Sequence, residues 1–420
     1  MNRVFDIKQR KIQYPSISDS PRKGRKEMKY FSDKPVNTGR QPEIDMSKAF
    51  LILLMIMIHA FQGVAPEAKG FLQTIMGYGA GFFGAGSFMI FMGIGMRFSR
   101  HQGSKNLVIR GIALLTVSQL KNLLIACIPG LIAYRLSGSG LFFEMMLGAI
   151  QSDIMTFAGL AFLLMALLKK IRMRDEWILL LGVVMNFLMI PVANAAISPE
   201  NYWVNRILGM FILTEDALFP LCQYFLFPAF GYLIGGFYTR ITDKEALAKR
   251  VLMICVPIVT VYFALRFSVP FPFLPEYIPE DEPALGTDAL AVCMDTLILI
   301  AVMYKISARI GGKAPAFVNH LSRHINSYYC ISDVLSGWAR ALLLVLTGEF
   351  LQSSLLPFLL GLLVTAACYF LIEINEKYIH FTVSGLRGTK RIVVYAAIWA
   401  ASVGIALYVL KLVPDVSELI

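Results

Sequence analysis

Long apolar runs recur from Ala49 almost to the end of this 420-residue chain. A run of about 20 apolar residues is long enough to cross a bilayer as a helix. The chain is 57% hydrophobic and only 16% charged, which is typical of an integral membrane protein with many crossings. The sequence therefore predicts an all-α polytopic membrane protein. We place eleven spans, near residues 49–65, 79–98, 107–128, 142–168, 177–197, 217–238, 251–268, 288–308, 326–347, 354–374 and 392–412.

The connections between these spans differ in charge. Basic connections alternate with connections that carry few bases, and in membrane proteins the base-rich loops lie in the cytosol. This pattern predicts a cytosolic N-terminus and an external C-terminus. It also accounts for the net charge of +11 without a nucleic-acid partner. The predicted inner loops are RFSRHQGSK, KKIRMRDE, TRITDKEALAKR, YKISARIGGKAPAFVNHLSRH and EKYIHFTVSGLRGTKR.

The chain divides into a short tail and one membrane domain. Residues 1–42 are polar and basic, and we expect them to be a disordered cytosolic tail, with the integral membrane domain at 43–420. The first forty residues lack the apolar core of a signal peptide. The tail either fixes the topology, which we favour, or attracts anionic lipid headgroups. The six cysteines lie in apolar segments without a CxxC pair, so we expect neither a disulfide framework nor a metal site.

The stretch Glu43–Gln62 places an ionisable residue deep in an apolar run. His59 follows Lys48 by eleven residues, or ~16 Å along a helix, which puts it near the middle of a bilayer. The same count from the predicted inner face places Lys121, Asp295 and Asp333 at about that depth. We infer a shared polar cavity. The alternative is that Lys121 pairs with the two aspartates merely to fix helix packing.

A buried cavity of this composition suits proton transfer. His59 can take and return a proton near neutral pH, and Asp333 or Asp295 could orient its ring. Lys121 could stabilise a developing oxyanion. Asp153 and Arg340 are expected nearer the outer face.

The N-terminal end of the first span offers charged groups to a ligand. Asp45 and Lys48 lie at the predicted cytosolic mouth, where the lysine could meet a phosphate-bearing donor. The next inner loop adds further bases on the same side, although for each of these taken singly the topology rule is the better explanation. These loop residues are Arg97, Arg100, His101, Lys105 and Arg110.

The spacing in the first span resembles the opening helix of the transmembrane acyltransferase superfamily. Ile44-Asp45, Lys48 and His59 match an acid, a base three residues on and a His fourteen residues after the acid, with Lys where these families usually have Arg. The superfamily includes the acyltransferase type 3 and heparan-α-glucosaminide N-acetyltransferase families. Four further stretches are similar to family motifs, although the last lacks the usual His and has Asp333 nearby. They are FGAGSFMIFMGIGM at 83–96, LGAIQSDIMTFAGLAFLLMALL at 147–168, LFPLCQYFLFPAFGYLIGGFY at 218–238 and NSYYCISDVL at 326–335.

This resemblance implies transfer of an acyl group, most simply acetyl, from cytosolic acyl-CoA to a hydroxyl or amine. The implied acceptor is a saccharide or glycolipid at the outer face of the plasma membrane, and no metal is implied. His59 would be a general base or a transient acyl carrier. A homodimer is compatible with this resemblance. The implied donor-binding residues are Asp45, Lys48, Arg97, Arg100, Arg110 and Gln151.

Two other classes of protein fit the same residues. A proton-coupled transporter could use the buried His, Lys and Asp groups as a proton relay around a substrate. A non-catalytic relative could keep the fold as a sensor or scaffold. The Asp45, Lys48 and His59 spacing on a single helix favours the acyltransferase, because a carrier has no particular need for it.

Overall fold

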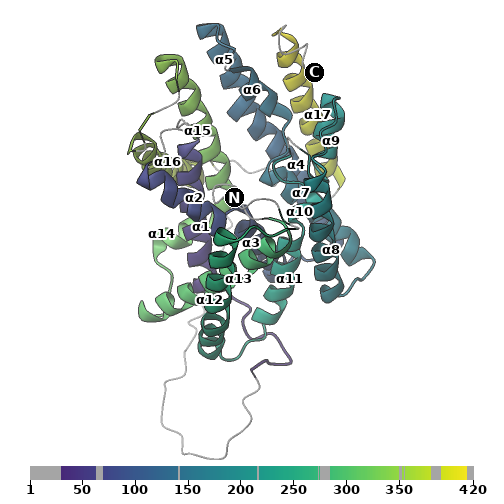
Figure 1. Cartoon of the computed structure of the whole chain (residues 1–420), viewed down its shortest axis with the longest axis vertical. Coiled ribbons are helices and arrows are strands. Elements are labelled where there is room, and N and C mark those ends of the chain that lie inside the picture. The colour runs from purple at the N-terminus through teal and green to yellow at the C-terminus, as the bar shows by residue number, and fades with distance from the viewer. Residues whose placement is uncertain are drawn as a thin grey trace, which may run out of the picture.

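The structure is a computed structural model that describes residues 30–62, 70–140, 142–214, 217–272, 274, 284–349, 352–353, 355–379 and 389–413. The described residues form a bundle of helices without a strand, which confirms the predicted all-α membrane fold (Figure 1). The first 29 residues of the expected tail lie outside the described ranges. Residues 30–41 precede the first helix, and Phe31 forms an isolated bridge with Ile241.

The helices follow one another in this order: α1 Pro42–Phe61, α2 Phe71–Phe83, α3 Ala85–Phe98, α4 Ser104–Asn122, η2 Leu123–Cys127, α5 Ile128–Ser137, α6 Phe142–Leu147, η3 Gly148–Ile150, α7 Ile154–Lys170, α8 Asp175–Asn194, α9 Tyr202–Leu208, α10 Leu221–Tyr224, α11 Leu226–Tyr238, α12 Lys244–Ser268, α13 Gly286–Arg309, α14 Ala316–Arg323, α15 Ile325–Thr347, α16 Leu355–Ile374, η4 Asn375–Ile379 and α17 Thr389–Lys411.

Ten helical stretches in the described part of the chain are long and apolar enough to cross a membrane. Each coincides with a predicted span. The remaining predicted span, near 217–238, is divided at Phe225 into α10 and the 13-residue α11. Neither piece has the length of a full crossing.

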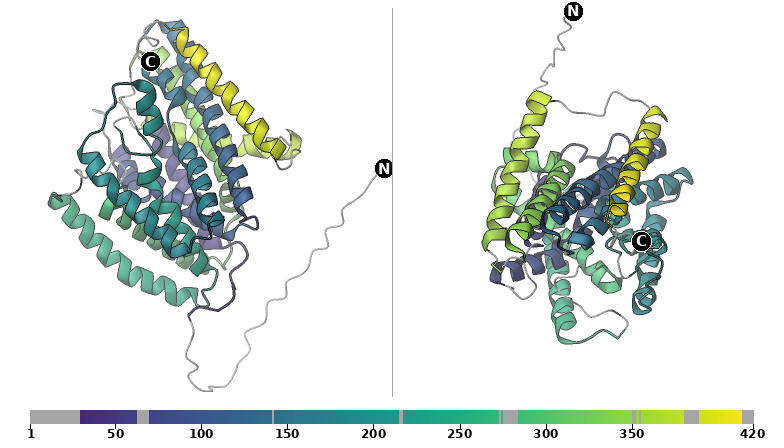
Figure 2. Two further views of the ribbon diagram at one scale, coloured as in Figure 1. Left: turned by 90° about the vertical axis from the view of Figure 1, so that its right-hand side faces the viewer. Right: turned by 90° about the horizontal axis from the view of Figure 1, so that it is seen from above.

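The spans differ in how much of each is covered by protein. We compare the fraction of buried residues in an apolar 18-residue window of each span. This fraction is 61% for the spans 71–98 and 145–170 and 56% for α1, but only 11% for the last span. Accordingly, α17 runs along the outside of the bundle in both views of Figure 2. The centre of the protein is therefore built from α1, α3 and α7.

Helices α3 and α11 cross at a point where their backbones nearly touch. A Cβ at Gly93 would lie 2.1 Å from the carbonyl oxygen of Pro228, and one at Gly231 would lie 2.0 Å from that of Ile90. No side chain fits such gaps, so glycine is required on both helices. The glycine-rich second span, 79–98, thus serves packing at this crossing.

We expect Gly231→Ala to destabilise the protein by about 1–3 kcal/mol, because the new methyl group must push α3 and α11 apart. Thermal unfolding of the purified protein in detergent measures the effect. The matched control is Gly95→Ala on α3, because a Cβ there has no neighbour within 4 Å. Equal unfolding temperatures for the two variants would contradict the close crossing.

A second glycine pair brings α4 against α7. A Cβ at Gly111 would lie 2.8 Å from the carbonyl oxygen of Gly159, and the reciprocal distance is 2.9 Å. Both spans are irregular beyond this contact. After Asn122 the first continues as the π-helical turn η2, and the second is non-helical from 151 to 153 before α7 begins. Such interruptions within membrane spans are found next to polar sites.

Candidate functional site

Side chains from three helices meet at the centre of the bundle. His59, near the end of α1, places its Nδ1 against Oδ1 of Asp333 on α15. The other carboxylate oxygen of Asp333 accepts a hydrogen bond from Nζ of Lys121, in the last turn of α4. One buried carboxylate therefore joins an imidazole to an ammonium group. Counting residues from the predicted inner face had placed these three residues at one depth, and their contacts agree with that prediction.

Asp153 is the fourth charged member of this cluster. Its Oδ2 lies 2.9 Å from Nζ of Lys121. Its Oδ1 accepts from the backbone N–H of Thr156 at 2.8 Å, which caps the N-terminus of α7, and from the hydroxyl of Ser118. The sequence had placed Asp153 nearer the outer face. The ion pair with Lys121 shows instead that the carboxylate of Asp153 reaches the level of the cluster.

Tyr329, one helical turn before Asp333 on α15, completes the surroundings. Its hydroxyl accepts from Nζ of Lys121 at 3.2 Å, and the ammonium lies 4.9 Å from the centre of its ring. The imidazole of His59 meets the same ring edge-on, with 6.1 Å between centroids. Lys121 therefore donates to one carboxylate and one phenol and forms an ion pair with a second carboxylate.

The members of the cluster differ in accessibility. The side chain of His59 is 20% exposed, whereas those of Lys121 and Asp333 are 5% and 6% exposed. No hydrogen bond joins Nε2 of His59 to another described residue. This nitrogen is therefore the atom of the cluster that can meet a substrate.

Asp295 does not join the cluster. It lies on α13, and its buried Oδ2 has no hydrogen-bond partner. Three of the four residues expected at one depth therefore lie together, and the expectation for Asp295 is wrong. Asp153 takes the place expected for Asp295 as the fourth charged residue of the cluster. Depth along a helix fixes height but does not fix the direction in which a side chain points.

The N-terminal end of α1 carries a second group of charges. Asp45 pairs with Arg40 at 2.8 Å and accepts from the hydroxyl of Ser322 on α14 at 2.6 Å. Lys48 makes no hydrogen bond to a described residue, although it lies near enough to Asp45 and Arg40 to feel their charges. Asp45 thus holds α14 and Arg40 in place, and Lys48 is the cation that remains available.

The remaining candidate residues lie in different surroundings. Arg97 donates to the hydroxyl of Tyr232 at 3.1 Å and pairs with Asp175 at 3.1 Å, so its guanidinium is engaged. Arg100 and Arg110 are exposed. Gln151 lies in the break before α7, where its carbonyl oxygen accepts from Asn122 at 2.8 Å. It therefore lies beside the Lys121 cluster, away from Lys48.

Three residues of these sites were not singled out from the sequence. Arg40 and Tyr329 carried no distinguishing pattern, while Asp153 had been assigned to the wrong depth. The signal for Asp153 was present in the stretch QSDIMT, because an aspartate directly before an apolar run is a common N-cap and marks the start of a helix.

The bundle of membrane-length helices defines a polytopic membrane protein, and inside it the imidazole of His59 contacts the buried carboxylate of Asp333. Residues 40–264 match the family model described as heparan-alpha-glucosaminide N-acetyltransferase, catalytic. Because the match covers more than half of the chain, the protein belongs to this family. Membership supports a membrane N-acetyltransferase and gives the transporter alternative no support. No curated protein and no solved structure matches the chain.

Proposed function

We propose that this protein transfers an acetyl group from acetyl-CoA to an amine or hydroxyl of a saccharide-type acceptor, with His59 at the reacting centre. The donor would reach the site from the cytosol, and the acceptor from the outer side of the cell membrane. The observation that carries this proposal is the contact between the accessible imidazole of His59 and the buried carboxylate of Asp333. The family match supports the acetyl group and the saccharide-type acceptor.

The His59–Asp333 contact defines what the imidazole can do. A carboxylate facing Nδ1 holds the tautomer with its proton on that atom, which leaves the lone pair on Nε2. As a general base, Nε2 would take the proton of the acceptor amine or hydroxyl. The nitrogen or oxygen of the acceptor would then attack the thioester carbonyl and release CoA. As a carrier, Nε2 would itself attack, release CoA and pass the acetyl group on. Asp333 would stabilise the positive charge that the ring acquires in either case.

Lys121 fits a positioning role better than the oxyanion role expected from the sequence. Its ammonium donates to Asp333 and to Tyr329 and forms an ion pair with Asp153. The ammonium is therefore already held by three side chains of the protein. We infer that it fixes the carboxylate of Asp333 against His59.

The donor phosphates would lie at the N-terminal end of α1. Three cations lie there: Arg40 pairs with Asp45, Lys244 pairs with Glu43, and Lys48 has no competing hydrogen bond among the described residues. Lys binds phosphate as a point charge without the paired hydrogen bonds of Arg. This end of α1 is eleven residues from His59, or ~16 Å, which a pantetheine arm in an extended form can bridge.

We expect Lys48→Met to raise KM for acetyl-CoA roughly tenfold with little change in kcat, because the lost contact is equal in ground and transition states. Steady-state kinetics on purified protein measure this. Arg174→Met is the matched control, since the Arg174 side chain is 75% exposed and pairs only locally with Glu176. An unchanged KM for Lys48→Met would place the donor phosphates elsewhere.

The proposed function is tested by incubating the detergent-purified protein with radiolabelled acetyl-CoA and a panel of amino sugars and neutral sugars. Release of CoA with label on a sugar supports it, and the labelled atom distinguishes N- from O-transfer. Omitting the sugar separates the two roles of His59. Label on the protein in the first turnover indicates the carrier, and its absence indicates the general base. No binding of acetyl-CoA and no transfer would contradict the proposal.

A further inference from the structure

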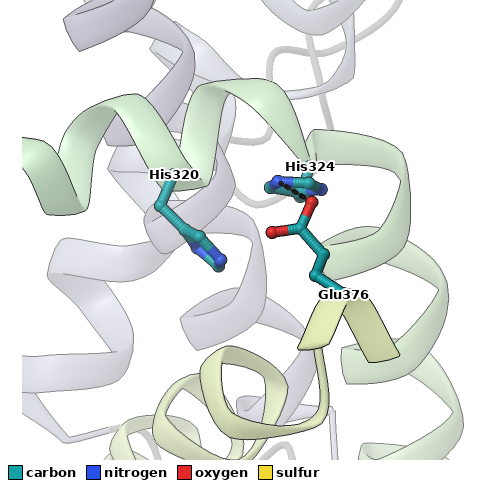
Figure 3. Close-up of side chains that lie close together, drawn as sticks. All are labelled: His320, His324 and Glu376. Atoms are coloured by element: carbon teal, nitrogen blue, oxygen red, sulfur yellow. Dashed lines mark ion pairs between the residues drawn. The ribbon is translucent and has the colours of Figure 1, made fainter. Parts of the chain in front are cut away.

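A second cluster of ionisable side chains lies where α14 meets the end of α16. His320 and His324 are four residues apart, one in α14 and the other at its end, so they project from the same side of one helical turn. Glu376 approaches them from the π-helical turn η4 (Figure 3). One ligand atom from each residue can be chosen so that all three lie within 4.8 Å of one another.

We propose that His320, His324 and Glu376 bind a zinc ion. Two imidazoles and one carboxylate are a ligand set that zinc uses in proteins, with metal–ligand bonds of ~2.0–2.2 Å. Two ligand atoms on a tetrahedron of that size lie ~3.3 Å apart. Nε2 of His324 and Oε1 of Glu376 are 3.2 Å apart, so this pair already has the required spacing. The third ligand needs only a small side-chain movement.

The surroundings of His320 suit a metal ligand. Its Nδ1 lies 2.9 Å from the hydroxyl of Tyr328, which can fix the tautomer as second-sphere groups do for zinc-bound histidines. Its Nε2 is buried without a hydrogen-bond partner and lies 3.3 Å from Oε1 of Glu373. Glu373 is one turn before Glu376 on the same side of the helix. It is therefore placed to supply a fourth ligand.

An ion can reach this cluster from outside the protein. The side chains of Glu373 and Glu376 are 46% and 52% exposed, whereas those of His320 and His324 are 12% and 21% exposed. His324 and Glu376 also line a pocket of about 630 Å³. The alternative reading is two His–Glu ion pairs that tie α14 to α16 without a metal. In that reading Nε2 of His320 has only the 3.3 Å ion pair with Glu373, without hydrogen-bond geometry, whereas a bound zinc would satisfy its lone pair.

Bound zinc would join two segments that are distant in the sequence. It would fix α14 to the end of α16, and α14 already holds Asp45 of α1 through Ser322. The site is separate from the His59 cluster, and its existence does not depend on the proposed acetyl transfer. The sequence-based expectation that the protein has no metal site is thereby replaced by a specific candidate.

The full-length protein, purified without a histidine tag and treated with chelator, tests this proposal. We expect dialysis against zinc to leave one ion per chain by elemental analysis. His324→Ala and Glu376→Gln should weaken binding at least tenfold, while His101→Ala, which removes an exposed histidine elsewhere, should not. Zinc should also raise the unfolding temperature of the wild type but not that of the two site variants.

Cobalt provides a readout that needs no variant. Cobalt bound to the metal-free wild-type protein should give the intense visible absorption of tetrahedral coordination, and added zinc should remove it. A stoichiometry well below one, or zinc binding that is unchanged in His324→Ala and Glu376→Gln, would overturn the site. Weak octahedral cobalt spectra would overturn it as well, because they indicate adventitious surface binding.

Discussion

Asp333→Asn is expected to lower kcat by roughly 10³- to 10⁴-fold, as in enzymes whose catalytic histidine loses its carboxylate partner. An amide can donate to Nδ1 of His59, which would move the imidazole proton to Nε2. The ring would then present a proton to the substrate where the reaction needs a lone pair. Binding of acetyl-CoA should be unchanged, because Asp333 lies in the buried centre away from Lys48.

The control for this variant is Asp295→Asn. Asp295 was predicted at the same depth, but the structure places it on α13 outside the cluster, with its buried Oδ2 unpartnered. We expect kcat of Asp295→Asn to stay within a fewfold of the wild type. Measured kcat values that fall equally in both variants would show that depth, and not contact with His59, determines the effect. The unfolding temperature of each variant checks that the fold is retained.

Lys121→Met is expected to destabilise the protein by about 3–5 kcal/mol, since removing one partner from a buried ion pair leaves uncompensated charge. The carboxylates of Asp333 and Asp153 would then face each other without the ammonium that lies between them. Unfolding of purified protein by denaturant or heat in detergent measures this loss. Lys170→Met, at the exposed end of α7, is the matched control and should be neutral.

A double variant separates charge from packing in this result. Lys121→Met with Asp153→Asn removes one positive and one negative charge, so the net charge of the cluster returns to that of the wild type. We expect it to recover a substantial part of the stability lost in Lys121→Met. A double variant as unstable as the single one would mean that Lys121 contributes through its shape or its contact with Tyr329, and not through charge.

Much of the fold could be predicted from apolar runs, because a bilayer imposes a minimum length on each crossing helix. The ten long spans all coincide with predicted runs. The break at Phe225 was not predicted. Pro228, in the first turn of α11, has no N–H to donate to the carbonyl of Tyr224, which interrupts the helical hydrogen bonding there. The break before α7 was signalled by Asp153, but a single polar residue within a long apolar run was not enough to predict a helix start there.

The site was predictable to the extent that height along a helix can be counted. His59, Lys121 and Asp333 come from helices far apart in the sequence, and the count brought them to one level. It could not exclude Asp295, because the rotation of α13 about its axis depends on packing against its neighbours. The histidines at 320 and 324 had a readable spacing of one helical turn. The approach of Glu376 from another segment, however, is a tertiary contact that no local pattern reports.

The role proposed for His59 in acetyl transfer is tested by comparing the wild type with His59→Ala at equal occupancy of acetyl-CoA. Release of CoA from labelled acetyl-CoA is measured with a sugar acceptor present. We expect acetylated sugar from the wild type, and only background turnover with retained acetyl-CoA binding from His59→Ala. Turnover by His59→Ala at the wild-type rate would contradict a catalytic role for His59.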